Sequence, residues 1–382
     1  MTFNYQNIKQ GKILKKFERI FIFLLLILSN VYLSAADKNM NYQPYLQSVS
    51  EHSAIIMVES GSSDNIIIEY GENQTNLNQS SQTYLYKQCV DNKSSFMHRI
   101  KLTGLKSNSQ YYYHIKNHTN NNAPFSFRTF VSTGTDFDFV CAGDCRSGTK
   151  PHSNIAKLIK SYSPLLCMYS GDLCYNGSYS SWIDEFFLPD EMKIIESAPF
   201  YNSIGNHEAG HNNTEIFTEA PESLSGHWDY YSFDCGDVHF LVLSTETTID
   251  PGSKQYMFAK TDLENTKKKW KFVMFHKPAY CAGGHGEDKT MIEVSKKIFV
   301  PNKVDCVLTG HSHFYQRNEV NGIKHLVIGG GGAPLYNPKN NNYTKVTKKD
   351  YHFANFEVKS DKIQVTVIND KNEKIDQFEI KK

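Results

Sequence analysis

The sequence predicts a small all-β sandwich followed by a layered α/β domain, and two patterns along its 382 residues support this. Between about residues 41 and 131, short β-type runs alternate with turn residues and show little helical periodicity. From residue 136 to residue 382, apolar strand-like runs recur, and several are separated by stretches with helical spacing. Because a chain of this length usually exceeds one compact domain, we expect 41–131 and 136–382 to fold as two domains.

The first 36 residues predict an export signal. Basic residues precede an unbroken apolar run, Ile20–Leu28, and small residues follow it, so we expect cleavage after Ala36. An uncleaved membrane anchor is the alternative, although the run is short for a bilayer. Cleavage would leave a secreted, periplasmic or cell-surface protein with no stable membrane insertion.

The first domain contains five predicted strands and one recognisable corner. Its segment Leu105–Tyr113 resembles the E–F corner of fibronectin type III domains, in which the hydroxyl of Tyr111 would bond backbone a few residues upstream. The tryptophan common on strand B of such domains is absent, and aliphatic residues stand there. We expect this domain to be a spacer packed on the second one. The predicted strands are Ile55–Val58, Ile66–Tyr70, Arg99–Leu102, Tyr111–Ile115 and Phe125–Phe130.

The second domain alternates predicted strands with helix-like stretches, which indicates a buried sheet covered by helices. A hairpin around Ser360 is expected to close a sheet, and the Asn/Lys-rich segment Asn337–Lys349 is expected to be a mobile loop. The predicted strands are Phe137–Ala142, Leu165–Ser170, Phe200–Ile204, Phe240–Ser244, Phe272–Phe275, Val304–Leu308, His325–Ile328, Phe353–Val358 and Ile363–Ile368.

Charge and cysteine content limit the possible partners. A formal net charge of +1 gives no electrostatic reason to expect nucleic acid or a membrane surface as a partner.

Eight cysteines in an exported chain allow disulfides, yet three lie inside apolar runs where a free thiol packs well. No CxxC pair is present, which argues against a structural zinc site. The sequence leaves the cysteine pairing and the oligomeric state open.

Potential metal ligands follow five of the predicted strands. Taken singly, each has an ordinary explanation, such as a turn aspartate or a hydrogen-bonded histidine. Their joint occurrence at successive strand ends is informative, because ligands of α/β sheets bind beyond the carboxyl ends of strands. Oxygen and imidazole donors suit iron, zinc or manganese, and a carboxylate able to bridge suits two metals. The residues are Asp144, Asp172, Tyr175, Asn206, His276, His311 and His313.

These residues stand in blocks that resemble the motifs of calcineurin-like metallophosphoesterases, and specifically of purple acid phosphatases. Tyr175, in the block Gly171-Asp172-Leu173-Cys174-Tyr175, is the feature that resembles the purple acid branch. The similarity covers essentially the whole mature chain. The resemblance implies an α/β/β/α catalytic domain behind a fibronectin-like one. The blocks are Gly143-Asp144, Gly171-Asp172-Leu173-Cys174-Tyr175, Gly205-Asn206-His207-Glu208, Val273-Met274-Phe275-His276 and Gly310-His311-Ser312-His313.

The resemblance also implies a role for each residue. A ferric ion, Fe(III), and a divalent metal (Fe, Zn or Mn) would share Asp172 as a bridge. His207 would lie near the phosphate, and His285 would protonate the leaving group, unless it is only an exposed loop histidine. The ferric ion would be held by Asp144, Asp172, Tyr175 and His313, and the divalent ion by Asp172, Asn206, His276 and His311.

The first block departs from the Asp-x-Gly pattern of the family, because it reads Asp144-Cys145-Arg146. The turn after Asp144 is therefore expected to differ. Arg146 could contact a substrate phosphate, since a guanidinium matches phosphate oxygens, or it could be a solvated loop residue. The run Gly329–Gly332 lacks the Lys-Ser/Thr of a phosphate loop and is interpreted as a tight turn beneath the site.

The resemblance implies hydrolysis of phosphate monoesters, with a small-molecule phosphoester as the partner. A phosphodiesterase or nucleotide pyrophosphatase on the same scaffold is the first alternative, because two-metal sites serve both reactions. A surface-binding protein with a vestigial metal site is the second. The natural substrate and the second metal are left open by the sequence.

Overall fold

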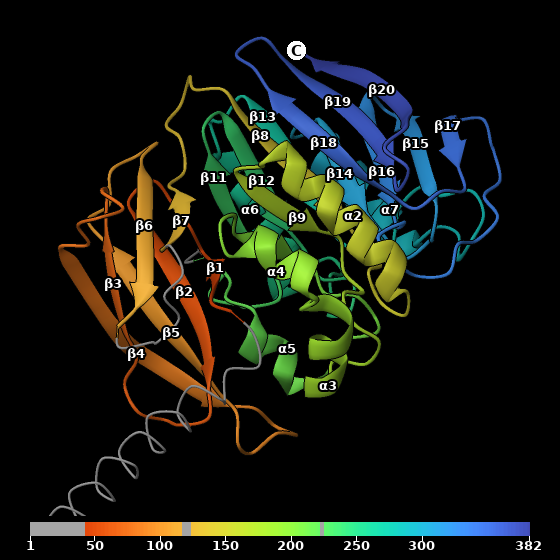
Figure 1. The fold of residues 1–382 in the computed structure, drawn as a ribbon. Coiled ribbons are helices and arrows are strands. Elements are labelled where there is room, and N and C mark those ends of the chain that lie inside the picture. Colours follow the sequence, from red (N-terminus) through yellow and green to blue (C-terminus); the bar gives the residue numbers. More distant parts are fainter. Residues whose placement is uncertain (1–42, 117–123, 222–224) are drawn as a thin grey trace, which may run out of the picture.

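The computed structural model describes residues 43–116, 124–221 and 225–382, which form three β-sheets and the helices that cover two of them (Figure 1). The predicted export signal lies outside the described residues. Within them, no helix is both long and apolar enough to cross a membrane.

The first sheet is entirely antiparallel and has the strand order β1-β2-β5-β4-β3-β6-β7. Strand β4 pairs with β5 along one part and with β3 along another, so it joins the two halves of the sheet. Its strands are β1 (Tyr45–Gln47), β2 (Ser53–Ser60), β3 (Ile67–Gly71), β4 (Gln79–Gln88), β5 (Phe96–Thr103), β6 (Gln110–Ile115) and β7 (Phe125–Arg128).

All five strands predicted for this sheet are present, and so is the predicted corner. The backbone N–H of Lys106 donates to the hydroxyl of Tyr111 at 3.0 Å, which confirms the predicted tyrosine contact. Sequence patterns missed β1 and β4. Strand β1 has three residues, and β4 is polar with mostly exposed or half-exposed side chains, so neither carries a detectable alternation.

The second sheet begins with a parallel group and continues with an antiparallel one, in the order β10-β9-β8-β18-β19-β20. The predicted hairpin around Ser360 is confirmed, because β18 and β19 pair on either side of it. The strands are β8 (Phe137–Ala142), β9 (Leu166–Tyr169), β10 (Phe200–Asn202), β18 (His352–Val358), β19 (Lys362–Asn369) and β20 (Lys374–Lys381).

The third sheet has the order β11-β12-β13-β14-β16-β15-β17, with β12, β13, β14 and β16 parallel. The prediction of a mobile loop at Asn337–Lys349 is wrong for its last third, where β17 pairs with β15 through backbone bonds. The strands are β11 (Tyr231–Cys235), β12 (Val238–Val242), β13 (Trp270–Met274), β14 (Cys306–Thr309), β15 (Tyr315–Val320), β16 (Ile323–Ile328) and β17 (Thr344–Lys348).

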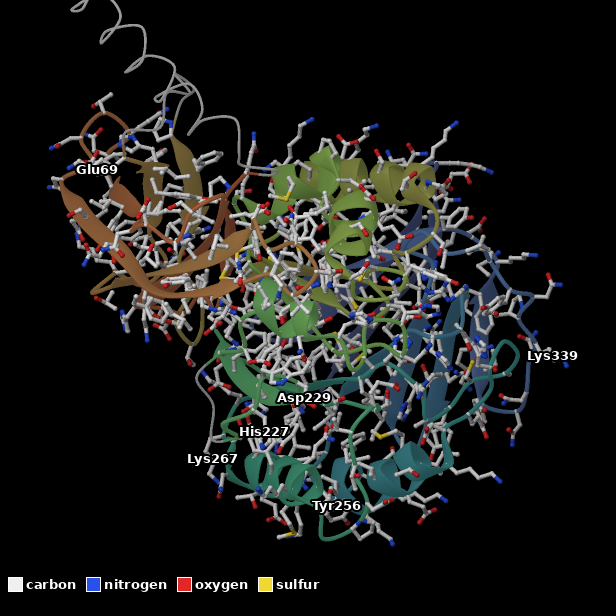
Figure 2. The ribbon with its side chains drawn as sticks, turned by 90° about the horizontal axis from the view of Figure 1, so that it is seen from below. Glu69, His227, Asp229, Tyr256, Lys267 and Lys339 are labelled. Carbon is white, nitrogen blue, oxygen red and sulfur yellow. The ribbon has the colours of Figure 1, made fainter. Side chains whose placement is uncertain are left out.

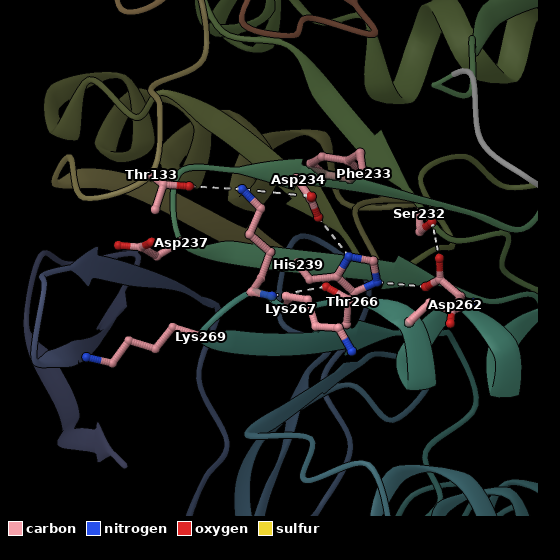
Figure 3. Close-up of a pocket in the computed structure, with 12 residues that line it drawn as sticks. Thr133, Ser232, Phe233, Asp234, Asp237, His239, Asp262, Thr266, Lys267 and Lys269 are labelled. Atoms are coloured by element: carbon pink, nitrogen blue, oxygen red, sulfur yellow. Dashed lines mark hydrogen bonds and ion pairs between the residues drawn. The ribbon is translucent and has the colours of Figure 1, made fainter.

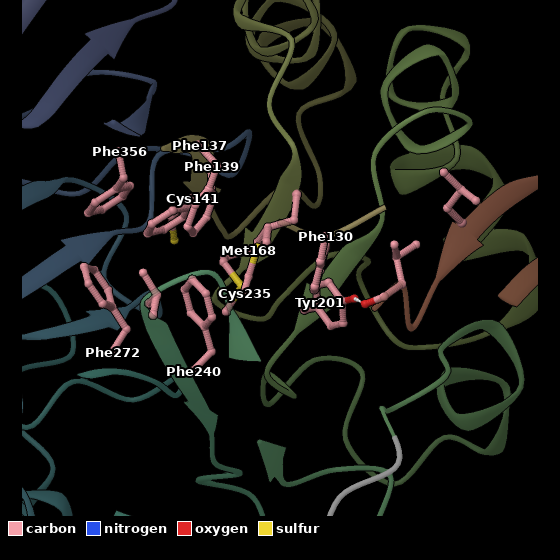
Figure 4. Packing of buried hydrophobic residues seen from close by; sticks show 14 of the residues in the cluster. Phe130, Phe137, Phe139, Cys141, Met168, Tyr201, Cys235, Phe240, Phe272 and Phe356 are labelled. Carbon is pink, nitrogen blue, oxygen red and sulfur yellow. Dashed lines mark hydrogen bonds between the residues drawn. The ribbon is translucent and has the colours of Figure 1, made fainter. Parts of the chain in front are cut away.

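The second and third sheets face each other across a core rich in phenylalanine (Figure 4). Phe139 of β8 stacks on Phe356 of β18 with ring centroids 4.5 Å apart. The edge of the same ring pair faces the third sheet, because Phe240 and Phe272 lie 5.2 and 5.5 Å from Phe139 in T-shaped contacts. Such aromatic packing adds to the area buried and holds the two sheets at a fixed separation.

Helices cover the outer faces of the second and third sheets, which gives the expected α/β/β/α layering. The apolar faces of α2 and α4 pack on β8–β10, and those of α6 and α7 pack on β12–β14. The helices are α2 (Thr149–Tyr162), α3 (Tyr179–Ser181), α4 (Pro189–Ile195), α5 (Asn212–Phe217), α6 (Lys254–Asn265) and α7 (Lys289–Val294), with π-helical turns at Trp182–Phe186 and Ser295–Phe299.

All eight cysteines are buried and none forms a disulfide. Burial raises the pKa of each thiol well above its ordinary value, for example to about 11 at Cys281 and Cys89. The cysteines therefore pack as small hydrophobic side chains.

The first sheet is joined to the α/β part by a buried arginine. Arg99 of β5 forms an ion pair with Glu219, and one of its terminal nitrogens donates to the backbone carbonyls of Glu215 and Ile216, at the end of α5. A cation at a helix carboxyl end is favourable because the carbonyls there are unpaired. Figure 2 shows both parts from below, with Glu69 on the first sheet and Tyr256 on α6.

Replacing Arg99 with alanine is expected to destabilise the protein by about 2–3 kcal/mol, because the half-buried Glu219 and the carbonyls after α5 lose their donor. Urea unfolding followed by circular dichroism would measure the change. Arg128→Ala, at an exposed position of β7, is the matched control and should change stability by less than about 0.5 kcal/mol. Equal effects of both variants would contradict a joining role for Arg99.

Candidate metal centre

Six of the predicted ligands converge beyond the carboxyl ends of strands in the second and third sheets, and we call these six residues the strand-end site. Three of them, Asp144, Asp172 and His311, have positive φ angles of 57°, 55° and 65°. Non-glycine residues rarely adopt this conformation because it is strained. Such strained residues cluster at functional sites, where they orient side chains. The six are Asp144 after β8, Asp172 after β9, Asn206 after β10, His276 after β13, and His311 and His313 after β14.

Three acceptor atoms face each other on one side of this site. The Nδ1 of His276 donates to the carbonyl of Ser170 at 2.7 Å, so its Nε2 carries the lone pair. That Nε2 lies 3.2 Å from Oδ1 of Asn206 and 3.3 Å from Oδ1 of Asp172. Three lone pairs converge there without a side-chain donor, and a cation is the natural complement. We call this place the divalent position.

Charges around His276 also favour a cation. Burial alone would lower the pKa of His276, but the negative charges of Asp172, Asp144 and Glu208 together outweigh burial and hold that pKa above its ordinary value. One ligand atom each from Asp144, Asp172 and His276 lies within 4.8 Å of the other two, and all three residues are buried. This group can hold a metal ion.

The motif Gly310-His311-Ser312-His313 places both of its imidazoles beside Asp144, Asp172 and His276. Burial, followed by repulsion from His276 and His285, lowers the pKa of His311 to about 2, so its ring is neutral and can bind a metal. The ring of His311 lies 5.0 Å from that of His276. His313 donates its Nδ1 to the carbonyl of Pro334 at 2.8 Å, which leaves its Nε2 facing Oδ1 of Asp144 at 3.4 Å.

Arg146 lies inside the site, between two of the predicted ligands. Its Nε donates to Oδ2 of Asp172 at 3.1 Å, and a terminal nitrogen lies 3.4 Å from Nε2 of His313. The other terminal nitrogen lies 3.4 Å from the hydroxyl of Ser147. The Arg146 side chain is 11% exposed, so it is not a solvated loop residue.

Tyr175 is not brought to the other predicted ligands. It is 55% exposed, and its ring contacts that of His207 at a centroid distance of 5.3 Å. Within the described part of the chain, its hydroxyl forms no hydrogen bond with Asp144, Asp172 or His313. Its carbonyl accepts from Nδ1 of His207 at 2.5 Å, so these two residues form a pair at the rim of the site.

The two predicted catalytic histidines lie on either side of the ligands. The Nε2 of His207 is 3.9 Å from Oδ2 of Asp172, and its backbone N–H donates to Oδ1 of the same carboxylate. His285 stacks on His311 with centroids 4.2 Å apart. Burial, followed by the charge of His313, lowers the pKa of His285, so the ring is neutral before a ligand binds.

Two residues that sequence reasoning did not assign support the site. Oε1 of buried Glu208 accepts from the backbone N–H groups of Asp172 and Gly205, which fixes the two turns that carry Asp172 and Asn206. Tyr336 stacks on His313 at 4.1 Å and contacts His285 edge-on at 5.3 Å. Glu208 is the last residue of the block Gly205-Asn206-His207-Glu208, so the sequence offered a signal for it. Nothing in the sequence around Tyr336 connects that residue with the histidines.

The run of glycines after β16 lies directly beneath Asp144. A Cβ at Gly331 would stand 2.5 Å from the carbonyl oxygen of Gly143, and one at Gly332 would stand 2.3 Å from that of Cys145. Any side chain there would push the Asp144 turn away from its place. The run therefore lies beneath the site, as predicted, and the chain bends there from residue 331.

A cavity of about 960 Å³ lies elsewhere, at the amino ends of β12 and β13 (Figure 3). In it, His239 bridges Asp234 and Asp262 at 2.8 and 2.7 Å. Burial opposes protonation, but these two carboxylates raise the pKa of His239 to about 9. None of the predicted site residues lines this cavity, so we assign the chemistry to the opposite ends of the strands.

Two family models match the chain. The calcineurin-like phosphoesterase model matches residues 137–315, and the model of the purple acid phosphatase N-terminal domain matches residues 42–129. The first match contains all six residues of the strand-end site, and the second covers the first sheet.

Relatives and a solved structure agree with these matches. The chain is 30% identical over 264 residues to purple acid phosphatase 22 of Arabidopsis thaliana, which covers 63% of this chain and 59% of that protein. It is 33% identical over 233 residues to the probable inactive purple acid phosphatase 9 of the same plant, covering 47% of this chain and 36% of the relative. The chain thus spans less than two thirds of the length of these relatives. A purple acid phosphatase from yellow lupin (Lupinus luteus) seeds shares the fold, with a TM-score of 0.76, 18% identity and coverage of 88% of this chain and 74% of the other.

Replacing Glu208 with alanine is expected to loosen the site. Two buried N–H groups would lose their acceptor, which costs about 3 kcal/mol of stability and lowers metal affinity at least about tenfold. Urea unfolding and metal titration would measure the two effects. Glu208→Gln keeps an acceptor oxygen at Oε1 and should retain most of both quantities. An alanine variant that binds metal as tightly as the wild type would contradict this role.

Proposed function

Because the chain belongs to the purple acid phosphatases, within the calcineurin-like phosphoesterases, we propose that it is a metal-dependent hydrolase of phosphate monoesters acting at the strand-end site. The observation that carries the proposal is the convergence of Oδ1 of Asp172, Oδ1 of Asn206 and Nε2 of His276, with Nδ1 of His276 held by a backbone carbonyl. Metal-ligating histidines typically donate their second nitrogen in this way.

The donor set fits a divalent iron, zinc or manganese ion at the divalent position, held by Asp172, Asn206, His276 and His311. When bound, such an ion polarises a phosphoryl oxygen and makes a water molecule more acidic. The ferric ion that the family resemblance implies would need Asp144, Asp172, Tyr175 and His313. These residues do not fit it as they stand, because Arg146 contacts two of them and Tyr175 is exposed.

The flanking histidines are suited to bind the ester and to move a proton. The ring of His207 lies at the rim beside Asp172, and its Nδ1 donates to the carbonyl of Tyr175, so its Nε2 can donate to a phosphate oxygen only when the ring carries a second proton. His285 is neutral before substrate binds, and a bound phosphate dianion would raise its pKa by direct charge attraction. His285 could then hold a proton at the leaving oxygen, as the family resemblance implies.

We propose export for the mature chain, on the basis of the basic and apolar pattern of residues 1–36. A secreted, periplasmic or cell-surface location follows from that signal. The small-molecule phosphoester partner rests on the strand-end site alone.

The test is hydrolysis of p-nitrophenyl phosphate and bis(p-nitrophenyl) phosphate by the purified protein supplied with Zn²⁺, Mn²⁺ or iron. We expect the monoester to be the faster substrate, chelation to abolish turnover, and added metal to restore it. His276→Ala should lower kcat at least about 100-fold, because it removes a ligand of the divalent position. His114→Ala, on the exposed surface of the first sheet, is the matched control.

Faster hydrolysis of the bis-ester would replace the proposal with a phosphodiesterase. A metal-loaded protein that hydrolyses neither ester would contradict an enzymatic role and would favour the surface-binding alternative.

A further inference from the structure

We propose that the guanidinium of Arg146 takes the place of the ferric ion, so that the chain binds one divalent metal ion instead of a two-metal centre. The inference rests on the proposed metal site, but not on which ester the protein hydrolyses. It concerns the ferric position, by which we mean the space bounded by Oδ2 of Asp172, Nε2 of His313 and Oδ1 of Asp144.

Arg146 stands where the family motif has the glycine of Asp-x-Gly. The positive φ angles of this turn belong to Asp144 and Ser147, at 57° and 63°, and not to Arg146. The backbone at position 146 therefore has no need of glycine and can carry a long side chain. That side chain turns inward, because it is only 11% exposed while its charged end reaches the ligands.

The contacts of Arg146 use the lone pairs that a metal would use. Its Nε donates to Oδ2 of Asp172 at 3.1 Å, and a terminal nitrogen is 3.4 Å from Nε2 of His313. Because Nδ1 of His313 is bound to the carbonyl of Pro334, its Nε2 is an acceptor, and the guanidinium supplies the donor. Metal–ligand bonds to these atoms would be about 2.0–2.2 Å long and would leave no room for N–H groups on the same lone pairs.

Charge gives a second reason. A guanidinium stays protonated at every pH that a folded protein experiences, so Arg146 cannot be neutralised to admit a metal. A trivalent cation next to it would be repelled at close range in a buried site. The single positive charge of Arg146 already compensates the negative charge at Oδ2 of Asp172.

The other two ferric ligands are also engaged elsewhere. Both carboxylate oxygens of Asp144 accept from the backbone N–H of His311, at 3.1 and 2.9 Å. Tyr175 is 55% exposed and packs on His207. The ferric position thus lacks the phenolate, and its Asp144 carboxylate already shares a backbone N–H.

The divalent position is different. Oδ1 of Asp172, Oδ1 of Asn206 and Nε2 of His276 face one another, and no arginine or lysine side chain of the described residues forms a hydrogen bond or ion pair with any of the three. The two oxygens of Asp172 therefore face two cation positions, one occupied by Arg146 and one suited to a metal.

Metal stoichiometry tests the inference without an activity assay. The full chain would be saturated with Zn²⁺, Mn²⁺ or iron, desalted, and measured by elemental mass spectrometry and visible absorption. We expect one ion per chain and no visible charge-transfer band. Arg146→Gly, which restores the family motif, should raise the content to two ions per chain. Arg146→Lys keeps a cation and should stay at one, as should the surface control Arg128→Gly.

Two ions in the wild type, or a visible band, would overturn the inference and leave the proposed phosphatase intact. An Arg146→Gly variant that is folded by circular dichroism but still holds one ion would also overturn it. If that variant does not fold, Arg146→Gln removes the charge at similar size and takes its place. No bound ion under any condition would refute the metal site itself. One ion without hydrolysis of either ester would refute only the proposed activity.

Discussion

The carboxylate of Asp172 is 1% exposed, and the arrangement of the site depends on how its charge is compensated. A buried carboxylate without partners would cost several kcal/mol. Its Oδ1 accepts the backbone N–H of His207, its Oδ2 accepts Nε of Arg146, and its own N–H is fixed by Glu208. Positive charge beside this carboxylate is therefore favourable, and Arg146 supplies it on the Oδ2 side.

The layers explain why these groups meet. Phe139 and Phe356 hold the second sheet against the third, so the carboxyl ends of β8, β9, β10, β13 and β14 arrive at one rim. The first sheet reaches the same rim from the side. Its loop residue Asp91 accepts from the backbone of Tyr179, after the Asp172 turn, and from Nδ2 of Asn213, after the Asn206 turn. The first sheet is thus packed on the second domain, as expected, and is bonded to the segments that follow two candidate ligands.

The apolar runs and the residues that end them predicted a layered α/β domain and the meeting of six strand-end residues, because buried strands and their carboxyl ends have a strong pattern. The α/β/β/α order of the layers was implied by the family resemblance. Strand β4 escaped prediction, since its polar side chains are mostly solvated on both faces. The inward turn of Arg146 and the outward turn of Tyr175 could not be predicted either. Both depend on which side chain fills a space between loops that are distant in sequence, and no local pattern records that.

Anomalous X-ray diffraction from crystals soaked in Zn²⁺ or Mn²⁺ would locate the metal most directly. We predict one anomalous peak, bounded by Asp172, Asn206, His276 and His311, with the guanidinium of Arg146 still on Asp172 and His313. Two peaks about 3.5–4 Å apart, with Arg146 displaced and Tyr175 turned inward, would contradict a one-metal site and restore the two-metal centre.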